Sequence, residues 1–132
     1  MAENFWYANL RQSVEESIRN VPDFPKEGIQ FKDITPLLKD VTLFEKLMSY
    51  YETKLRGKGI NKIVCVDARG FIFGSVLASK MGIPFVLARK SGKLPSKTIG
   101  HTYNLEYGTA TIEMHIDDIK SSDTVLVVDD LL

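Results

Sequence analysis

The sequence has few of the residues from which covalent or metal frameworks are built. It contains one cysteine, Cys65, and two histidines, which excludes an internal disulfide and a cysteine-built zinc site. No apolar run approaches the roughly 18 residues that a membrane span needs. The first residues also lack the basic flank and apolar stretch of a secretory signal. Since 132 residues suffice for one domain, we expect a cytoplasmic, single-domain protein with no membrane partner.

An excess of charge is also missing. Seventeen basic and seventeen acidic residues cancel, so no overall field attracts nucleic acid or an anionic membrane. The charges are nevertheless segregated, because residues 68–105 include no acidic residue, and the charged residues of 113–130 are all acidic except Lys120. Any single charge could simply be a solvated surface group. The basic cluster at residues 89–93 lies in a glycine-containing loop after an apolar strand, however, and this predicts a polyanionic ligand.

Hydrophobic periodicity predicts helices that alternate with strands. The predicted helices cover residues 10–19, 42–55 and 71–80, and the predicted strands cover 62–66, 85–88 and 124–128. Thr42 and Glu45 have the spacing of a capping box. Residues 102–116 alternate like a hairpin that turns at Gly108, with His115 on its exposed face. Apolar strands between helices indicate an α/β fold with a parallel sheet that helices cover on both faces.

The segment 21–38 is apolar but rich in proline and glycine, so it cannot form a long regular element. Because loops are normally polar and exposed, this one either covers the core or lines a binding site. Cys65, between two valines, is most simply a buried apolar residue.

Polar groups follow two predicted strands at the sheet edge where ligands of parallel sheets bind. The first group is Asp67-Ala68-Arg69-Gly70, at the start of a helix. Gly70 allows a close backbone approach to a ligand, and Arg69 adds a cation. The alternative is that Asp67 only caps the helix and Arg69 is solvated.

The second group is Asp129-Asp130. Adjacent carboxylates after a buried strand repel each other, and they could bind a vicinal diol or hydrated magnesium. The alternative is a solvated loop start.

Five motifs together resemble the adenine phosphoribosyltransferase family. They are DFPKEGIQFKDITPLL at 23–38, VDARGFIFG at 66–74, ARKSGKLP at 88–95, YNLEYG at 103–108 and VVDDLL at 127–132. The resemblance implies a type I phosphoribosyltransferase fold with a flexible hairpin lid around residues 94–107. It also implies a small N-terminal segment, the hood, at about residues 1–38 and a core at 39–132. The reaction implied is adenine plus phosphoribosyl pyrophosphate giving AMP and pyrophosphate in purine salvage, with magnesium, in a homodimer.

The resemblance also implies roles for particular residues. Those that bind substrate would be Gln30, Phe31, Lys32, Asp67, Ala68, Arg69, Gly70, Arg89, Lys90, Lys93, Asp129, Asp130 and Leu131. The catalytic residues would be Glu106, Arg69 and Tyr107, and magnesium would bind through substrate and water rather than directly. Whether Glu106 or a backbone carbonyl handles the purine proton stays open.

In the family, the last motif continues into an Ala-Thr-Gly-Gly-Thr phosphate loop, whereas this sequence stops at Leu132. We therefore expect it to be part of a longer chain, with the C-terminal part of the fold missing. Two alternatives remain open: a phosphoribosyltransferase for another purine, and a non-catalytic module that binds a nucleotide or phosphoribosyl pyrophosphate.

Overall fold

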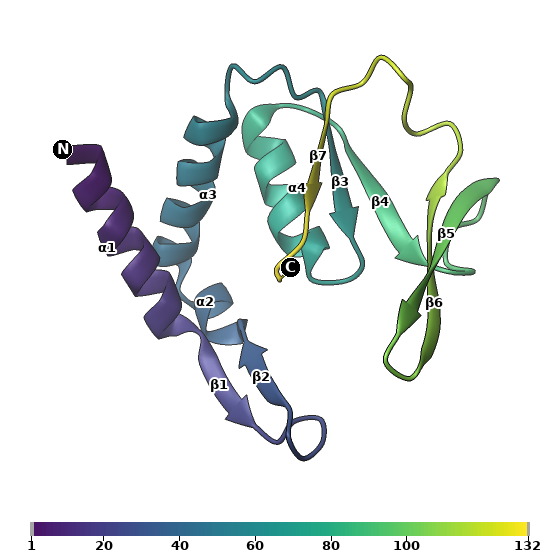
Figure 1. Ribbon diagram of the computed structural model, residues 1–132. Helices are drawn as coiled ribbons and strands as arrows, with labels where there is room; N and C mark the ends of the chain where they lie inside the picture. The colour runs from purple at the N-terminus through teal and green to yellow at the C-terminus, as the bar shows by residue number, and fades with distance from the viewer. Residues whose placement is uncertain (1, 132) are drawn as a thin grey trace. The chain divides into compact units, whose positions relative to one another are not determined.

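The computed structural model describes residues 2–131, and these form two compact units that divide between Tyr50 and Tyr51. The elements along the chain are labelled in Figure 1. No helix within the described residues is long and apolar enough to cross a membrane.

The first unit is a set of helices with a small hairpin. Its elements are α1 (Ala2–Ser17), β1 (Arg19–Pro22), β2 (Gln30–Asp33), α2 (Thr35–Lys39) and α3 (Val41–Leu55), whose last residues belong to the second unit. The strands β1 and β2 pair antiparallel. The proline-rich segment therefore forms a short hairpin and one helical turn, in agreement with the expectation that it holds no long regular element.

Two details of the first unit correct the sequence-based prediction. Helix α1 starts eight residues before the predicted position 10 and ends before Ile18. Its first half packs through aromatic rings, since Trp6 and Tyr7 lie 5.8 and 5.1 Å from the ring of Tyr50. The capping box was also wrong: the N–H of Leu43 donates to the carboxylate of Asp40 at 3.0 Å, so Asp40 caps α3.

The second unit is built on a five-stranded sheet. Its elements are β3 (Lys62–Val66), α4 (Gly70–Met81), β4 (Phe85–Lys90), β5 (Thr98–Leu105), β6 (Gly108–His115) and β7 (Val125–Val128). The strand order is β5-β6-β4-β3-β7. The strands β4, β3 and β7 are parallel, and the β5–β6 hairpin joins them antiparallel. The predicted strands and the turn at Gly108 are confirmed, but the sheet is mixed rather than wholly parallel.

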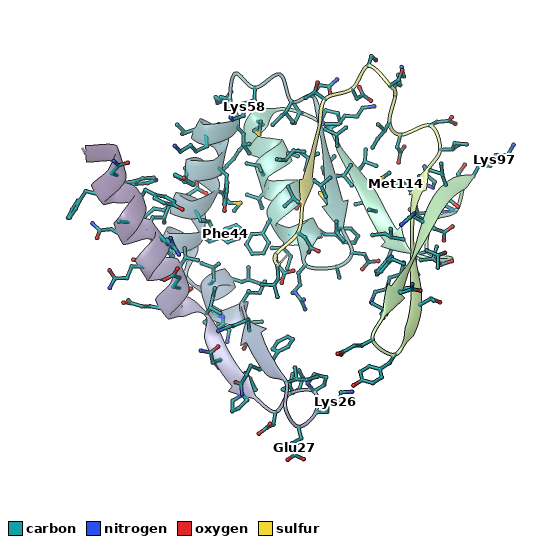
Figure 2. All side chains as sticks on the ribbon, viewed as in Figure 1. Lys26, Glu27, Phe44, Lys58, Lys97 and Met114 are labelled. Atoms are coloured by element: carbon teal, nitrogen blue, oxygen red, sulfur yellow. The ribbon has the colours of Figure 1, made fainter. Side chains whose placement is uncertain are left out.

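The core of this unit has two sides. On one side α4 packs against β3 around Ile63, Cys65 and Ala78, all fully buried. The prediction that Cys65 is a buried apolar residue is confirmed, and burial raises the pKa of its thiol to about 11. On the other side Val64 and Val86 pack against Met114 of β6, which is labelled in Figure 2. Apolar side chains from β6 and the following loop thus contribute to this side.

Candidate functional site

The carboxyl ends of β3 and β7 lie beside the start of α4. The guanidinium Nε of Arg69 donates to the carboxylate of Asp130 at 2.5 Å, and the Asp130 side chain is only 6% exposed. Gly70 makes this approach possible, because a Cβ there would lie 2.5 Å from the carbonyl oxygen of Val128. The structure thus gives Gly70 a packing role against β7, and it shows that Arg69 and Asp130 are not simply solvated.

Asp67 links the end of β3 to the end of β4. Its carboxylate accepts hydrogen bonds from Arg89 Nε at 3.4 Å and from the backbone N–H of Lys90 at 3.3 Å. The first residue flanking α4 is Arg69, which makes no side-chain cap bond. The alternative that Asp67 serves only as a helix cap is therefore wrong. The peptide bond between Asp67 and Ala68 is cis.

The basic cluster forms a tight turn after β4. The N–H of Lys93 donates to the carbonyl of Lys90 at 3.3 Å, and Gly92 has φ +80°, which suits the third position of such a turn. Arg89 donates to the carbonyl of Lys93 at 3.3 Å and lies 5.9 Å from the ring centre of Phe71. We call residues 90–93 the cationic turn. Together with Arg69 it gathers positive charge at the sheet edge where anionic ligands bind.

Asp129 and Asp130 form a close carboxylate pair. The N–H of Asp130 donates to Asp129 Oδ1 at 2.8 Å. Partial burial raises the pKa of Asp129, and the neighbouring Asp130 carboxyl raises it further. Within residues 2–131, no group of three histidine, cysteine or acidic side chains is placed to hold a metal ion. Carboxylate oxygens are the donors that magnesium prefers, so this pair is the part of the site that fits that ion.

The segment predicted as the lid, residues 94–107, comprises a stretch before β5, the strand β5 itself and the turn at the tip of the β5–β6 hairpin. Leu105 pairs with Gly108, so Glu106 and Tyr107 form the turn between the strands. Tyr107 is 81% exposed, and the tip projects on the same side of the sheet as the carboxyl ends of β3 and β7 but lies apart from them (Figure 1). The structure therefore does not bring Glu106 and Tyr107 to the cluster at Arg69. Leu131 follows β7 and is also exposed; the last motif residue, Leu132, lies outside the described residues.

The residues predicted to bind the base lie on β2, in the first unit. Gln30 and Lys32 are two positions apart, so their main-chain groups point to the same edge of the strand. The strand partner of Gln30 is Pro22, which has no N–H to donate. Between these positions, the ring of Phe31 meets that of Phe24 edge-on at 5.1 Å.

Phe24 is held by the loop that joins β1 and β2. The carboxylate of Asp23 accepts the N–H of Gly28 at 2.8 Å, and the N–H of Phe24 donates to the carbonyl of Ile29 at 3.2 Å. No local pattern in the sequence identifies Phe24 as a neighbour of Phe31.

Two polar residues of β6 differ from the sequence-based prediction. His115 is half-buried rather than exposed; its Nε2 accepts the N–H of Ser96 at 3.3 Å, and its Nδ1 lies 3.6 Å from Asp118. Glu113 was not singled out, yet it accepts hydrogen bonds from Gly92 and Thr98. His115 thus contacts the segment between the cationic turn and β5, and Glu113 contacts the turn and the first residue of β5 on either side of that segment; periodicity alone does not reveal these contacts.

A groove of about 650 Å³ lies elsewhere, in the first unit between α1 and the start of α3. Its lining includes Leu10, Ser13, Leu43 and Lys46, and none of the residues predicted for the site. It therefore adds nothing to the chemistry described above.

Residues 31–132 match the family model described as phosphoribosyl transferase domain. The adenine phosphoribosyltransferase of Photorhabdus laumondii is 48% identical over 125 residues, which cover 95% of this chain and 68% of that protein. The enzyme of the same name from Geotalea daltonii is 52% identical over 121 residues, covering 92% of this chain and 71% of the relative.

Solved structures agree with these sequence comparisons. An adenine phosphoribosyltransferase from Thermoanaerobacter pseudethanolicus is 44% identical with a TM-score of 0.85, covering 90% of this chain and 69% of that one. The Saccharomyces cerevisiae enzyme, solved with an iminoaltritol bisphosphate and adenine, is 36% identical with a TM-score of 0.88. That match covers 93% of this chain and 72% of the yeast chain. The expected type I phosphoribosyltransferase fold is confirmed.

Proposed function

The chain belongs to the adenine phosphoribosyltransferases, and from that premise we propose that it makes AMP and pyrophosphate from adenine and phosphoribosyl pyrophosphate. The observation that carries the proposal is the cluster at the carboxyl ends of β3, β4 and β7. This cluster consists of the Arg69–Asp130 ion pair and the cationic turn, which Asp67 binds at Lys90. The sequence that contains it is about 50% identical to enzymes of this name.

The cluster has the charges that such a transfer requires. Negative charge grows on the pyrophosphate as its bond to the ribose breaks, and Arg69, Lys90 and Lys93 would stabilise it. Positive charge develops on the ribose ring at the same time, which favours nearby carboxylates. Asp129 and Asp130 supply these, and their oxygens also suit the ribose hydroxyls.

For the purine we propose the edge of β2, with the main-chain groups of Gln30 and Lys32 reading the base and Phe31 stacking on it. Leu131 would contact the opposite face of the base. Closure of the hairpin tip would carry Glu106 and Tyr107 to the reacting centre and exclude water. We also propose magnesium, bound near the Asp129–Asp130 pair through the substrate and water rather than directly; when bound, it neutralises charge on the leaving pyrophosphate. We also propose that the protein forms a homodimer in the cytoplasm. This part of the proposal rests on membership of the family alone.

The test is release of pyrophosphate from phosphoribosyl pyrophosphate, with and without adenine. We expect release only with adenine, and strong loss of it in Asp130→Asn. The exposed Asp117 carries the same charge without contacts to the cluster, so Asp117→Asn is the matched control. Preference for guanine would support a different base, and binding of AMP without turnover would support a binding module. No adenine-dependent release would contradict the proposal.

A further inference from the structure

A carboxylate that is not among the site residues assigned above forms hydrogen bonds to both the cationic turn and the start of β5. Glu113 lies near the carboxyl end of β6. Its Oε1 accepts the N–H of Gly92 and its Oε2 accepts the hydroxyl of Thr98, both at 2.7 Å. Hydrogen bonds from Thr98, Gly92 and Ser91 lower the pKa of Glu113, so it is ionised at neutral pH.

The neighbouring strand leaves room for this carboxylate. Gly100 on β5 is the direct partner of Glu113. A Cβ at position 100 would lie 3.2 Å from Cγ of Glu113 and 3.3 Å from Cγ2 of Thr111. These distances are tighter than ordinary van der Waals contact, so any larger residue at position 100 would press on the Glu113 side chain.

The rest of the segment is held by main-chain bonds that do not depend on Glu113. The N–H of Ser91 donates to Thr111 at 3.1 Å, and the N–H of Ile116 donates to Lys97 at 3.0 Å. Lys97 marks the end of the hairpin opposite the tip in Figure 2. Loss of the Glu113 carboxylate should therefore loosen the turn at Gly92 while the hairpin stays paired.

We propose that Glu113 is a positioning residue for pyrophosphate recognition, which it serves by fixing the cationic turn. The anchored Gly92 fixes the adjacent Lys93, whose carbonyl also receives Arg89. A cation cluster that is already ordered loses less conformational entropy when the anion binds. The inference rests on the proposed function, because it takes pyrophosphate and phosphoribosyl pyrophosphate as the ligands.

The experiment compares Glu113→Ala, Glu113→Gln and the exposed control Asp117→Asn. Hydrogen–deuterium exchange should become faster around Gly92 in Glu113→Ala, with the amides of β6 unchanged. Titration with magnesium pyrophosphate should give about tenfold weaker binding, the order expected for loss of a hydrogen bond to a charged group. Glutamine still accepts the Gly92 N–H, so Glu113→Gln should restore most of the affinity. The control should behave as wild type.

Steady-state kinetics distinguish a positioning role of Glu113 from a general loss of structure in the variant. In Glu113→Ala the KM for phosphoribosyl pyrophosphate should rise while kcat changes little. If Glu113→Ala fails to fold, Thr98→Val removes one of the anchoring donors and should show the same trend more weakly. Equal pyrophosphate affinity in the variants and wild type would overturn the inference alone. If the wild-type protein neither binds pyrophosphate nor makes AMP, the proposed function is wrong and the inference falls with it.

Discussion

The contact between Gly74 and Cys65 offers a quantitative test of how α4 packs on the sheet. A Cβ at position 74 would lie 2.2 Å from Sγ of Cys65 and 3.2 Å from its Cβ. An ordinary contact begins near 3.4 Å, so Gly74→Ala must move the helix or the thiol by about 1 Å. Cys65 is fully buried in β3 and cannot turn away.

The expected cost follows from this geometry. Forcing a methyl group into a packed core costs about 1–3 kcal/mol, and the fixed position of Cys65 places Gly74→Ala at about 3 kcal/mol. Cys65→Ala removes the buried sulfur and should cost about 1 kcal/mol. In the double variant the new methyl occupies the space that the sulfur leaves. We therefore expect a total cost of about 2 kcal/mol instead of about 4, a favourable coupling of about 2 kcal/mol.

Urea unfolding followed by far-ultraviolet circular dichroism measures these free energies, provided that the m-value stays constant. Ser79→Ala, an exposed change on the same helix, is the control and should be neutral or slightly stabilising. Additive costs in the double variant would refute the packing argument, as would a neutral Gly74→Ala.

Three further changes test other parts of the structure. Backbone and side-chain hydrogen bonds, the Lys120 amide first, lower the pKa of Asp123 to about 2; its ionised form thus stabilises the fold above about pH 4, and that contribution is lost as the pH falls toward 2. Asp123→Asn should therefore flatten the decline of unfolding free energy between these pH values in a urea series. Asp40→Ala should cost about 1 kcal/mol in the same assay, because it removes the cap of α3; an unchanged midpoint would contradict the cap. Gly70→Ala places a methyl group 2.5 Å from the carbonyl oxygen of Val128 in β7. The resulting displacement of Asp130 should lower kcat/KM at least about tenfold. Wild-type activity would contradict this, because it would mean that β7 can shift to accommodate the methyl group.

The parts of the fold that were predictable are those with a strong local signal. The strand β3 lies between β4 and β7 inside the sheet, and its residues 63–66 are apolar on both faces, so the sequence indicates a buried strand. Gly82 ends α4 in the left-handed conformation, as a glycine after a helix indicates. The first half of α1 was missed because its packing partner, Tyr50, lies more than forty positions away.

The candidate site was predictable as separate groups but not as pairs. The rule that ligands bind at strand carboxyl ends singled out Arg69 and Asp130 independently. Their ion pair spans 61 positions and depends on the order in which β3 and β7 join the sheet. No local pattern records that order. The same applies to Asp67, which resembled a helix cap but binds the end of β4 instead.

The segregation of charge along the chain has a structural consequence. The segment 68–105 contains the cationic turn and no acid of its own, so any carboxylate that orders this turn must come from outside the segment. The structure supplies one from each side: Asp67 precedes the segment and binds Lys90, and Glu113 follows it and binds Gly92. Both use main-chain N–H groups as donors, so the lysine side chains are not consumed by these bonds. An anion site needs ordered cations whose charge is not already neutralised, and anchoring through the backbone meets both requirements.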